Sequence, residues 1–246
     1  MYDPARGVAV TEVALASASE VGDVVKVAVE ASRGWGATPL SRRVPMLFRL
    51  RELLDGHRDE LAATITREHG KVHDDALGEV ARGIECVEFA CGIPTLLAGS
   101  LSREVATGVD VHTVLEPVGV VAGITPFNFP VMVPLWMTAN ALACGNAFIL
   151  KPSEKDPSAS LLLAELVHEA GFPDGVFNVV QGDAEAVEAL LTAPEVGAVS
   201  FVGSTPVARH VYEVGTNHGK RVQALGGAKN HMVVLPDADI GAAADP

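Results

Sequence analysis

One amide side chain draws attention in the stretch PFNFP, residues 126–130, because it lies between two aromatic residues and two prolines. This amide belongs to Asn128, and the stretch joins two apolar runs. An amide donor fixed at the end of a strand can stabilise an oxyanion in a transition state, an effect worth about 3 kcal/mol. A turn asparagine that bonds its own backbone is the alternative that the stretch alone leaves open.

A cation and a carboxylate follow the next apolar run, in the stretch KPSEK. Lys151 ends the run and Glu154 follows across a turn that Pro152 enforces. Such a pair can bind the hydroxyl groups of a ribose, as the acidic residue of dinucleotide-binding folds does. An ion pair in a solvated loop is the alternative.

A third polar stretch, FVGSTPVA, places Ser204 between an apolar strand and a predicted helix. Helix amino-termini attract phosphate through free N–H groups and the local dipole. A serine that only caps the helix is the alternative, since serine is preferred at that position anyway. The glycine-rich GxGxxG pattern of the common Rossmann site is absent from the sequence, so each of the three stretches is a weak signal by itself.

Alternating strands and helices must position these residues. From Pro117 onward, short β-branched runs alternate with helical segments of about ten residues, which predicts βαβ units and a parallel sheet covered on both faces. The expected strands are 118–124, 147–151, 176–180 and 198–203. Because ligands bind beyond the carboxyl ends of parallel strands, the three polar stretches should meet at one edge of the sheet.

The chain before Pro117 has a different spacing of apolar and polar residues. Residues 20–90 carry apolar side chains at helical spacing and predict a set of helices. Residues 100–116 alternate β-branched and polar side chains around Gly108, which predicts a hairpin that projects from the body. The predicted fold class is therefore α/β, a Rossmann-like parallel sheet with amino-terminal helices and a protruding β-hairpin.

The composition excludes several classes of partner. With 18 Lys and Arg against 31 Asp and Glu, the net charge of −13 argues against nucleic acid and anionic membranes, both of which require clustered basic residues. No apolar run reads as a membrane span and no signal peptide is visible, so we expect a cytoplasmic protein. The odd number of cysteines, 3, fits a reducing compartment, and their spacing does not fit a metal site.

The three polar stretches occur in an order and spacing that resemble the aldehyde dehydrogenase superfamily. PFNFP, GNAFILKPSE and FVGST agree with it, as do EHGK before them and GAKNHMVVLPDADI after them, so the resemblance covers nearly the whole chain. It implies an NAD site and an oxyanion-hole role for Asn128. It also implies cofactor contacts for Thr125 and Phe127 beside the nicotinamide, for Lys151, Glu154 and Lys155 at the adenosine ribose, for Ser204 facing the pyrophosphate, and for Gly226.

The resemblance also implies a division of the chain and an assembly. Residues 1–99 are expected to be the amino-terminal helical part of the NAD-binding domain, and residues 100–116 an oligomerisation hairpin. Residues 117–226 would be the βαβ core, and residues 227–246 the start of a catalytic domain. Members of the superfamily form dimers or tetramers and act on small aldehydes, so a homo-oligomer with a small aldehyde substrate is expected.

One position narrows the resemblance to a branch. Hydrolytic members carry LELGGK, whose Glu activates the deacylating water, whereas this chain reads QALGGAK with Leu225 at that position. Leucine cannot act as a general base, so the acyl group would have to leave by attack of a thiol. The chain therefore resembles the coenzyme-A-acylating branch, which oxidises methylmalonate and malonate semialdehyde with NAD to propionyl-CoA and acetyl-CoA.

The substrates of this branch carry a carboxylate, for which an arginine with its planar fork of donors is the expected partner. The resemblance implies this role for Arg82, in the predicted helix EVARGIECVEF, because the branch has an arginine on the corresponding helix. An exposed Arg82 that pairs with Glu79 or Glu85 is the alternative.

The nucleophile of the superfamily is a cysteine that family spacing places about a dozen residues beyond Pro246. The cysteines that are present, Cys86, Cys91 and Cys144, are expected to pack rather than react. The chain is therefore expected to be the amino-terminal half of such an enzyme and to be inactive alone. Two alternatives remain, an NAD-binding or assembly module without catalysis and a fragment of a hydrolytic aldehyde dehydrogenase.

Overall fold

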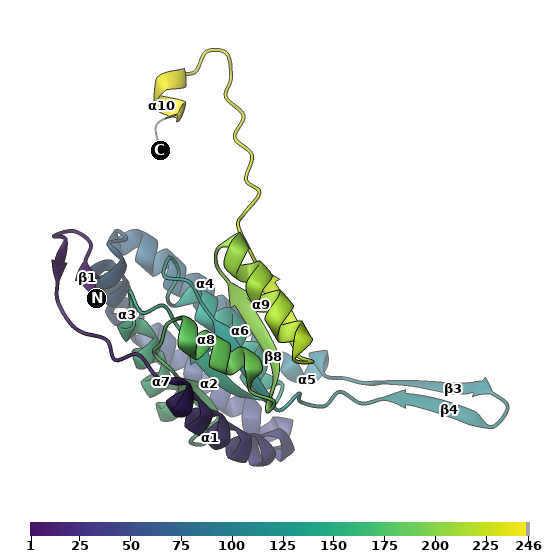
Figure 1. Cartoon of the computed structure of the whole chain (residues 1–246). Helices are drawn as coiled ribbons and strands as arrows, with labels where there is room; N and C mark the ends of the chain where they lie inside the picture. The colour runs from purple at the N-terminus through teal and green to yellow at the C-terminus, as the bar shows by residue number, and fades with distance from the viewer. Residues whose placement is uncertain (245–246) are drawn as a thin grey trace.

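The computed structural model describes residues 1–244 and has a parallel sheet at its centre (Figure 1). The sheet contains five strands in the order β7-β6-β5-β8-β9. They are β5 (Val120–Ile124), β6 (Ala147–Lys151), β7 (Phe177–Val179), β8 (Val196–Val202) and β9 (Arg221–Leu225). The predicted α/β class is confirmed, and β6, which is buried along its whole length, has the bounds expected from its sequence.

Two apolar cores lie on the two faces of the sheet. One core receives side chains from α1 (Ala18–Ala37), α8 (Ala184–Thr192) and α9 (Thr205–Asn217). The other is built from α2 (Leu40–Gly56), α3 (Arg58–His69), α4 (His73–Cys91), α6 (Met132–Ala143) and α7 (Ser158–Glu169). Ile149 of β6 enters the first core and its neighbours Phe148 and Leu150 enter the second, because successive strand residues point to opposite faces.

The predicted hairpin is also confirmed. After α5 (Ile93–Leu96), β3 (Ser100–Ala106) pairs antiparallel with β4 (Val109–Thr113), and Gly108 adopts a φ of 71° between them. Every residue of the two strands is exposed, and the hairpin extends away from the body (Figure 1). Leu101 and Val111 are among its exposed apolar side chains, so the hairpin offers an apolar surface to solvent.

Strand β9 was not predicted. Its residues alternate between exposed and partly buried, and it carries an arginine and a glutamine, so its sequence lacks the continuous apolar run of the central strands. It lies at the edge of the sheet, where pairing with β8 alone defines it.

The two ends of the chain are peripheral. A short ribbon of β1 (Tyr2–Asp3) and β2 (Val8–Ala9) begins the chain, and α3 contacts β1. After β9 an exposed tail leads away from the body to α10 (Ile240–Ala244) (Figure 1). Residues 227–246 were predicted to begin a catalytic domain. The last two of them, Asp245 and Pro246, lie outside the described residues. Within residues 1–244, no helix is long and apolar enough to cross a membrane.

Candidate functional site

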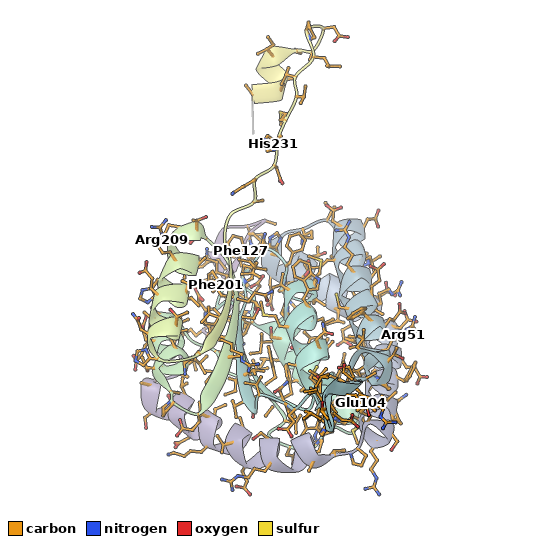
Figure 2. The ribbon with its side chains drawn as sticks, turned by 90° about the vertical axis from the view of Figure 1, so that its right-hand side faces the viewer. Arg51, Glu104, Phe127, Phe201, Arg209 and His231 are labelled. Carbon is orange, nitrogen blue, oxygen red and sulfur yellow. The ribbon has the colours of Figure 1, made fainter. Side chains whose placement is uncertain are left out.

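The carboxyl ends of β5, β6 and β8 open into a groove of about 640 Å³. Parallel strands end at the same edge of a sheet, so residues far apart in the sequence meet there. Figure 2 shows Phe127, one of the lining residues, at the end of the molecule from which the tail departs. Most of the predicted cofactor residues line this groove, namely Thr125, Phe127, Lys151, Glu154, Lys155 and Ser204.

Lys151 and Glu154 combine one buried and one accessible charged group. The Lys151 side chain is 7% exposed and that of Glu154 43%, and the Nζ and Oε2 atoms are 3.4 Å apart. Lys151 ends the fully buried β6, so the sheet fixes its aliphatic stem while its ammonium group reaches the groove. A contact this long leaves both groups able to form further hydrogen bonds. The pair is thus not a solvated loop pair, since its cation is held by the sheet.

Two hydroxyl groups of the groove are without partners in the described part of the chain. The Thr125 hydroxyl is buried and unbonded, although the Thr125 backbone N–H donates to the Lys151 carbonyl at 3.1 Å. Ser204 occupies the N-cap position of α9, yet its side chain makes no capping hydrogen bond. Pro206 has no N–H, so the first turn of α9 offers the N–H groups of Thr205 and Val207, which Ser204 does not cap, beside the groove, and this suits an anionic group.

Asn128 lies in the exposed turn between β5 and α6, next to Phe127 of the groove. Its carbonyl accepts a hydrogen bond from Lys71 Nζ at 2.9 Å. Its side-chain amide forms no hydrogen bond to any residue from 1 to 244, so the self-bonded turn asparagine is not what this structure contains. The amide is therefore free to donate to a ligand.

The Phe127 ring forms a partly open wall between the groove and α3. It is 46% exposed, with Lys155 Nζ 4.5 Å from its centroid. The His69 ring stacks on it at 6.0 Å and an interplanar angle of 24°. Burial, followed by the charge of Lys71, lowers the pKa of His69 below its ordinary value. The cation over the ring and the stacked neutral imidazole restrict the orientation of Phe127.

Asp156 is a buried acid that the sequence did not reveal, and it lines a neighbouring cavity that shares Phe127 and Glu154 with the groove. Its side chain is 2% exposed, and neither carboxyl oxygen has a hydrogen-bond partner within the described residues. Burial first, and then the charges of Glu68 and Glu79, raises the pKa of Asp156 to about 8. Nothing in KPSEKDP distinguishes this aspartate from a loop residue, because its burial depends on helices distant in sequence.

Some predicted residues lie elsewhere. Arg82 is on the exposed face of α4, away from the groove, and it forms no salt bridge within residues 1–244. Glu79, one of its suggested partners, is instead bound to Lys71 at 2.6 Å. Gly226 lies beside the start of α9, where an added Cβ would be 3.0 Å from the Thr205 hydroxyl. The structure thus places Arg82 and Gly226 outside the cluster of groove residues.

The cysteines are unsuited to nucleophilic attack. They are free thiols in the described part of the chain, and each is buried or partly buried: Cys86, Cys91 and Cys144. Burial raises the pKa of each thiol above its ordinary value, which lowers the fraction of reactive thiolate.

Comparison with known proteins connects this geometry to one family. The profile described as "Aldehyde dehydrogenase family" matches residues 1–246. The malonate-semialdehyde dehydrogenase of Pseudomonas aeruginosa is 54% identical over 240 residues, which cover 98% of this chain and 48% of that protein. Malonate-semialdehyde dehydrogenase 3 of Geobacillus kaustophilus is 54% identical over 238 residues, 97% of this chain and 49% of the relative. The chain therefore spans about half the length of the curated relatives it matches.

Solved structures of two related proteins are similar to this chain in both fold and sequence. A putative methylmalonate-semialdehyde dehydrogenase from Sinorhizobium meliloti 1021, complexed with NAD, aligns with a TM-score of 0.88 and 52% identity. The alignment covers 94% of this chain and 47% of that one. The methylmalonate-semialdehyde dehydrogenase of Oceanimonas doudoroffii aligns with a TM-score of 0.88 and 56% identity, over 93% of this chain and 47% of the other.

Proposed function

The chain belongs to the aldehyde dehydrogenase family, as its motifs predicted, and from this premise we propose that it forms the NAD-binding half of an enzyme that oxidises malonate or methylmalonate semialdehyde. The observation that carries the proposal is the groove in which Lys151, Glu154, Thr125 and Ser204 converge. Its residues fit a dinucleotide, because the groove combines two hydroxyl groups without partners in the described structure, a half-exposed carboxylate and a helix amino-terminus.

Each groove residue has a proposed role. Lys151 and Glu154 hold the hydroxyl groups of the adenosine ribose, with Lys155 beside them. The amino-terminus of α9 at Ser204 faces the pyrophosphate. Thr125 and Phe127 contact the nicotinamide half. Gly226, outside the groove and beside the start of α9, remains a proposed cofactor contact.

In the chemistry we propose, NAD supplies a hydride acceptor when bound, and the chain supplies the oxyanion donor. The Asn128 amide, free of other bonds in the described structure, donates to the aldehyde oxygen as negative charge develops there. The attacking thiolate would come from a carboxyl-terminal half, since the three cysteines of this chain are buried or partly buried thiols with raised pKa values. We therefore expect this chain alone to be inactive.

Coenzyme A is the proposed acyl acceptor. Leu225 stands at the end of β9, 43% exposed, where hydrolytic members carry the glutamate that activates water. Arg82 remains the proposed partner of the substrate carboxylate. It is exposed and unpaired within residues 1–244, so its guanidinium is available to a carboxylate of the substrate.

We also propose the division of the chain and its assembly. Residues 1–99 complete the NAD-binding domain whose core is 117–226, and residues 227–246 begin a catalytic domain. The hairpin within 100–116 mediates a homo-oligomer, because its exposed apolar side chains need a partner surface.

The test joins this chain to a carboxyl-terminal half that carries the nucleophile. Malonate semialdehyde should then reduce NAD with formation of acetyl-CoA and release of the substrate carboxylate as CO2, and free acid should not accumulate without coenzyme A. Leu225→Glu should introduce coenzyme-A-independent release of acid, whereas Leu225→Gln, of equal size but not a base, should not. Release of free acid by the parent enzyme without coenzyme A would instead support the hydrolytic alternative.

A further inference from the structure

A buried ion pair lies directly beneath the turn that carries Asn128. Lys71 follows Gly70, whose φ of 85° ends α3, and its side chain is 13% exposed. Glu79 on α4 has a side chain that is 1% exposed, and its Oε2 atom is 2.6 Å from Lys71 Nζ. Burying two charges costs hydration free energy, and further hydrogen bonds to the pair must compensate for that cost.

Both members of the pair bind the backbone of the turn, Lys71 at Asn128 and Glu79 just after the turn. Lys71 Nζ donates to the Asn128 carbonyl at 2.9 Å and lies 4.2 Å from the centroid of the Phe129 ring. Glu79 Oε1 accepts hydrogen bonds from the N–H groups of Val131 at 2.9 Å and Met132 at 3.2 Å. The Lys71 ammonium group therefore fixes the Asn128 carbonyl, and the Glu79 carboxylate fixes the backbone where the turn joins α6.

The turn needs such external support because it has few internal bonds. Pro126 and Pro130 have no N–H to donate, and Val131, the N-cap residue of α6, provides no side-chain cap. Glu79 replaces that cap by accepting from the first donors of α6, where a negative charge is favoured by the helix dipole.

We propose that Lys71 and Glu79 are positioning residues for the oxyanion donor. They fix the backbone of the turn, so that the Asn128 side-chain amide keeps one orientation although the amide itself forms no hydrogen bond within residues 1–244. This inference rests on the proposed role of Asn128. Neither side chain lines the groove, so their effect should fall on the rate of hydride transfer and not on NAD affinity. A misplacement of about 1 Å can lower a rate by about 100-fold.

The test measures kcat for NADH formation, with this chain continued by the half that carries the nucleophile. Lys71→Met should lower kcat about 10-fold or more with little change in the KM for NAD, and Lys71→Arg, which keeps the charge and donors, should restore most of it. Lys26→Met is the matched control, because Lys26 forms an exposed pair with Asp23 on α1.

A double-mutant cycle separates positioning from mere folding. If Lys71 acts through Asn128, Lys71→Met should have little further effect in an Asn128→Ala background. The single variant leaves the buried Glu79 unpaired. If it does not fold for that reason, the double variant Lys71→Met/Glu79→Gln, which removes both charges, replaces it in the measurement. Its kcat should be about 10-fold or more below that of the parent, with little change in the KM for NAD.

Three results would overturn the inference, in different ways. A parent-like rate for Lys71→Met beside a slow Asn128→Ala would refute the positioning role and leave the proposed function intact. A parent-like rate for Asn128→Ala would refute the oxyanion assignment itself, and the positioning role with it. Equal losses from Lys71→Met in the parent and Asn128→Ala backgrounds would also refute it, since the effect would then not pass through Asn128.

Discussion

The ionisation of Asp156 is coupled to folding, and this coupling can be measured. Burial and the neighbouring carboxylates raise its pKa to about 8 from the ordinary value of 3.8. Between these values the unfolded chain is ionised at this site while the folded chain keeps the proton, so the free energy of unfolding falls as pH rises and levels off above about pH 8. Asp156→Asn removes this dependence, because an amide does not titrate.

The magnitude follows from the slope. One pH unit corresponds to about 1.36 kcal/mol, so the stability of Asp156→Asn relative to the parent should increase by about 2.7 kcal/mol between about pH 5 and about pH 7. Burying the amide without hydrogen-bond partners has its own cost of about 1–3 kcal/mol. That cost is the same at both pH values, so it cancels from the comparison.

Urea unfolding at the two pH values provides the measurement, with the fluorescence of the buried Trp35 as the signal. Asp237→Asn is the control, because Asp237 is exposed in the tail and should show no such pH-dependent gain. An Asp156→Asn variant whose stability relative to the parent is the same at both pH values would refute the reasoning, since Asp156 would then ionise in the folded chain as it does in water.

Two further stability predictions concern packing and backbone geometry. Gly145→Ala should be destabilising in urea unfolding, since Gly145 has a φ of 88° and a new Cβ would lie 2.6 Å from an Arg43 guanidinium nitrogen. Gly22→Ala is its control, because nothing lies within 4 Å and alanine should stabilise the interior of α1 by up to about 1 kcal/mol. Trp35→Leu should lower the free energy of unfolding by about 3 kcal/mol, because it removes a fully buried ring and the 3.0 Å bond from Nε1 to the Leu142 carbonyl. An unchanged urea midpoint in either destabilised variant would contradict the packing described for it.

The sequence was sufficient for the two central strands β5 and β6, because they are buried along most of their length. The run AFILK at residues 147–151 is apolar until its final lysine, and no helical spacing competes with it. Strand β9, by contrast, carries Arg221 and Gln223 and is defined by its pairing with β8. Its existence depends on a neighbour distant in sequence, which a local pattern does not contain.

The site could be predicted to the extent that its residues follow strands. Lys151 and Ser204 come directly after apolar runs, so the topology of a parallel sheet brings them together. Asp156 and the support of the Asn128 turn by Lys71 could not be predicted in this way. The support of the turn depends on a contact between residues 57 positions apart in the chain, and the burial of Asp156 depends on helices distant in sequence.

The most direct test of the account is a calorimetric titration of NAD into the 246-residue chain and two variants. We expect saturable binding by the parent chain, and binding about 10-fold weaker for Glu154→Gln, which removes the charged acceptor of the ribose hydroxyl groups. Glu165→Gln, at an exposed position of α7 away from the groove, should bind as the parent does. Absence of binding by the parent, or equal affinity for Glu154→Gln and the parent, would contradict the assignment of the groove to NAD.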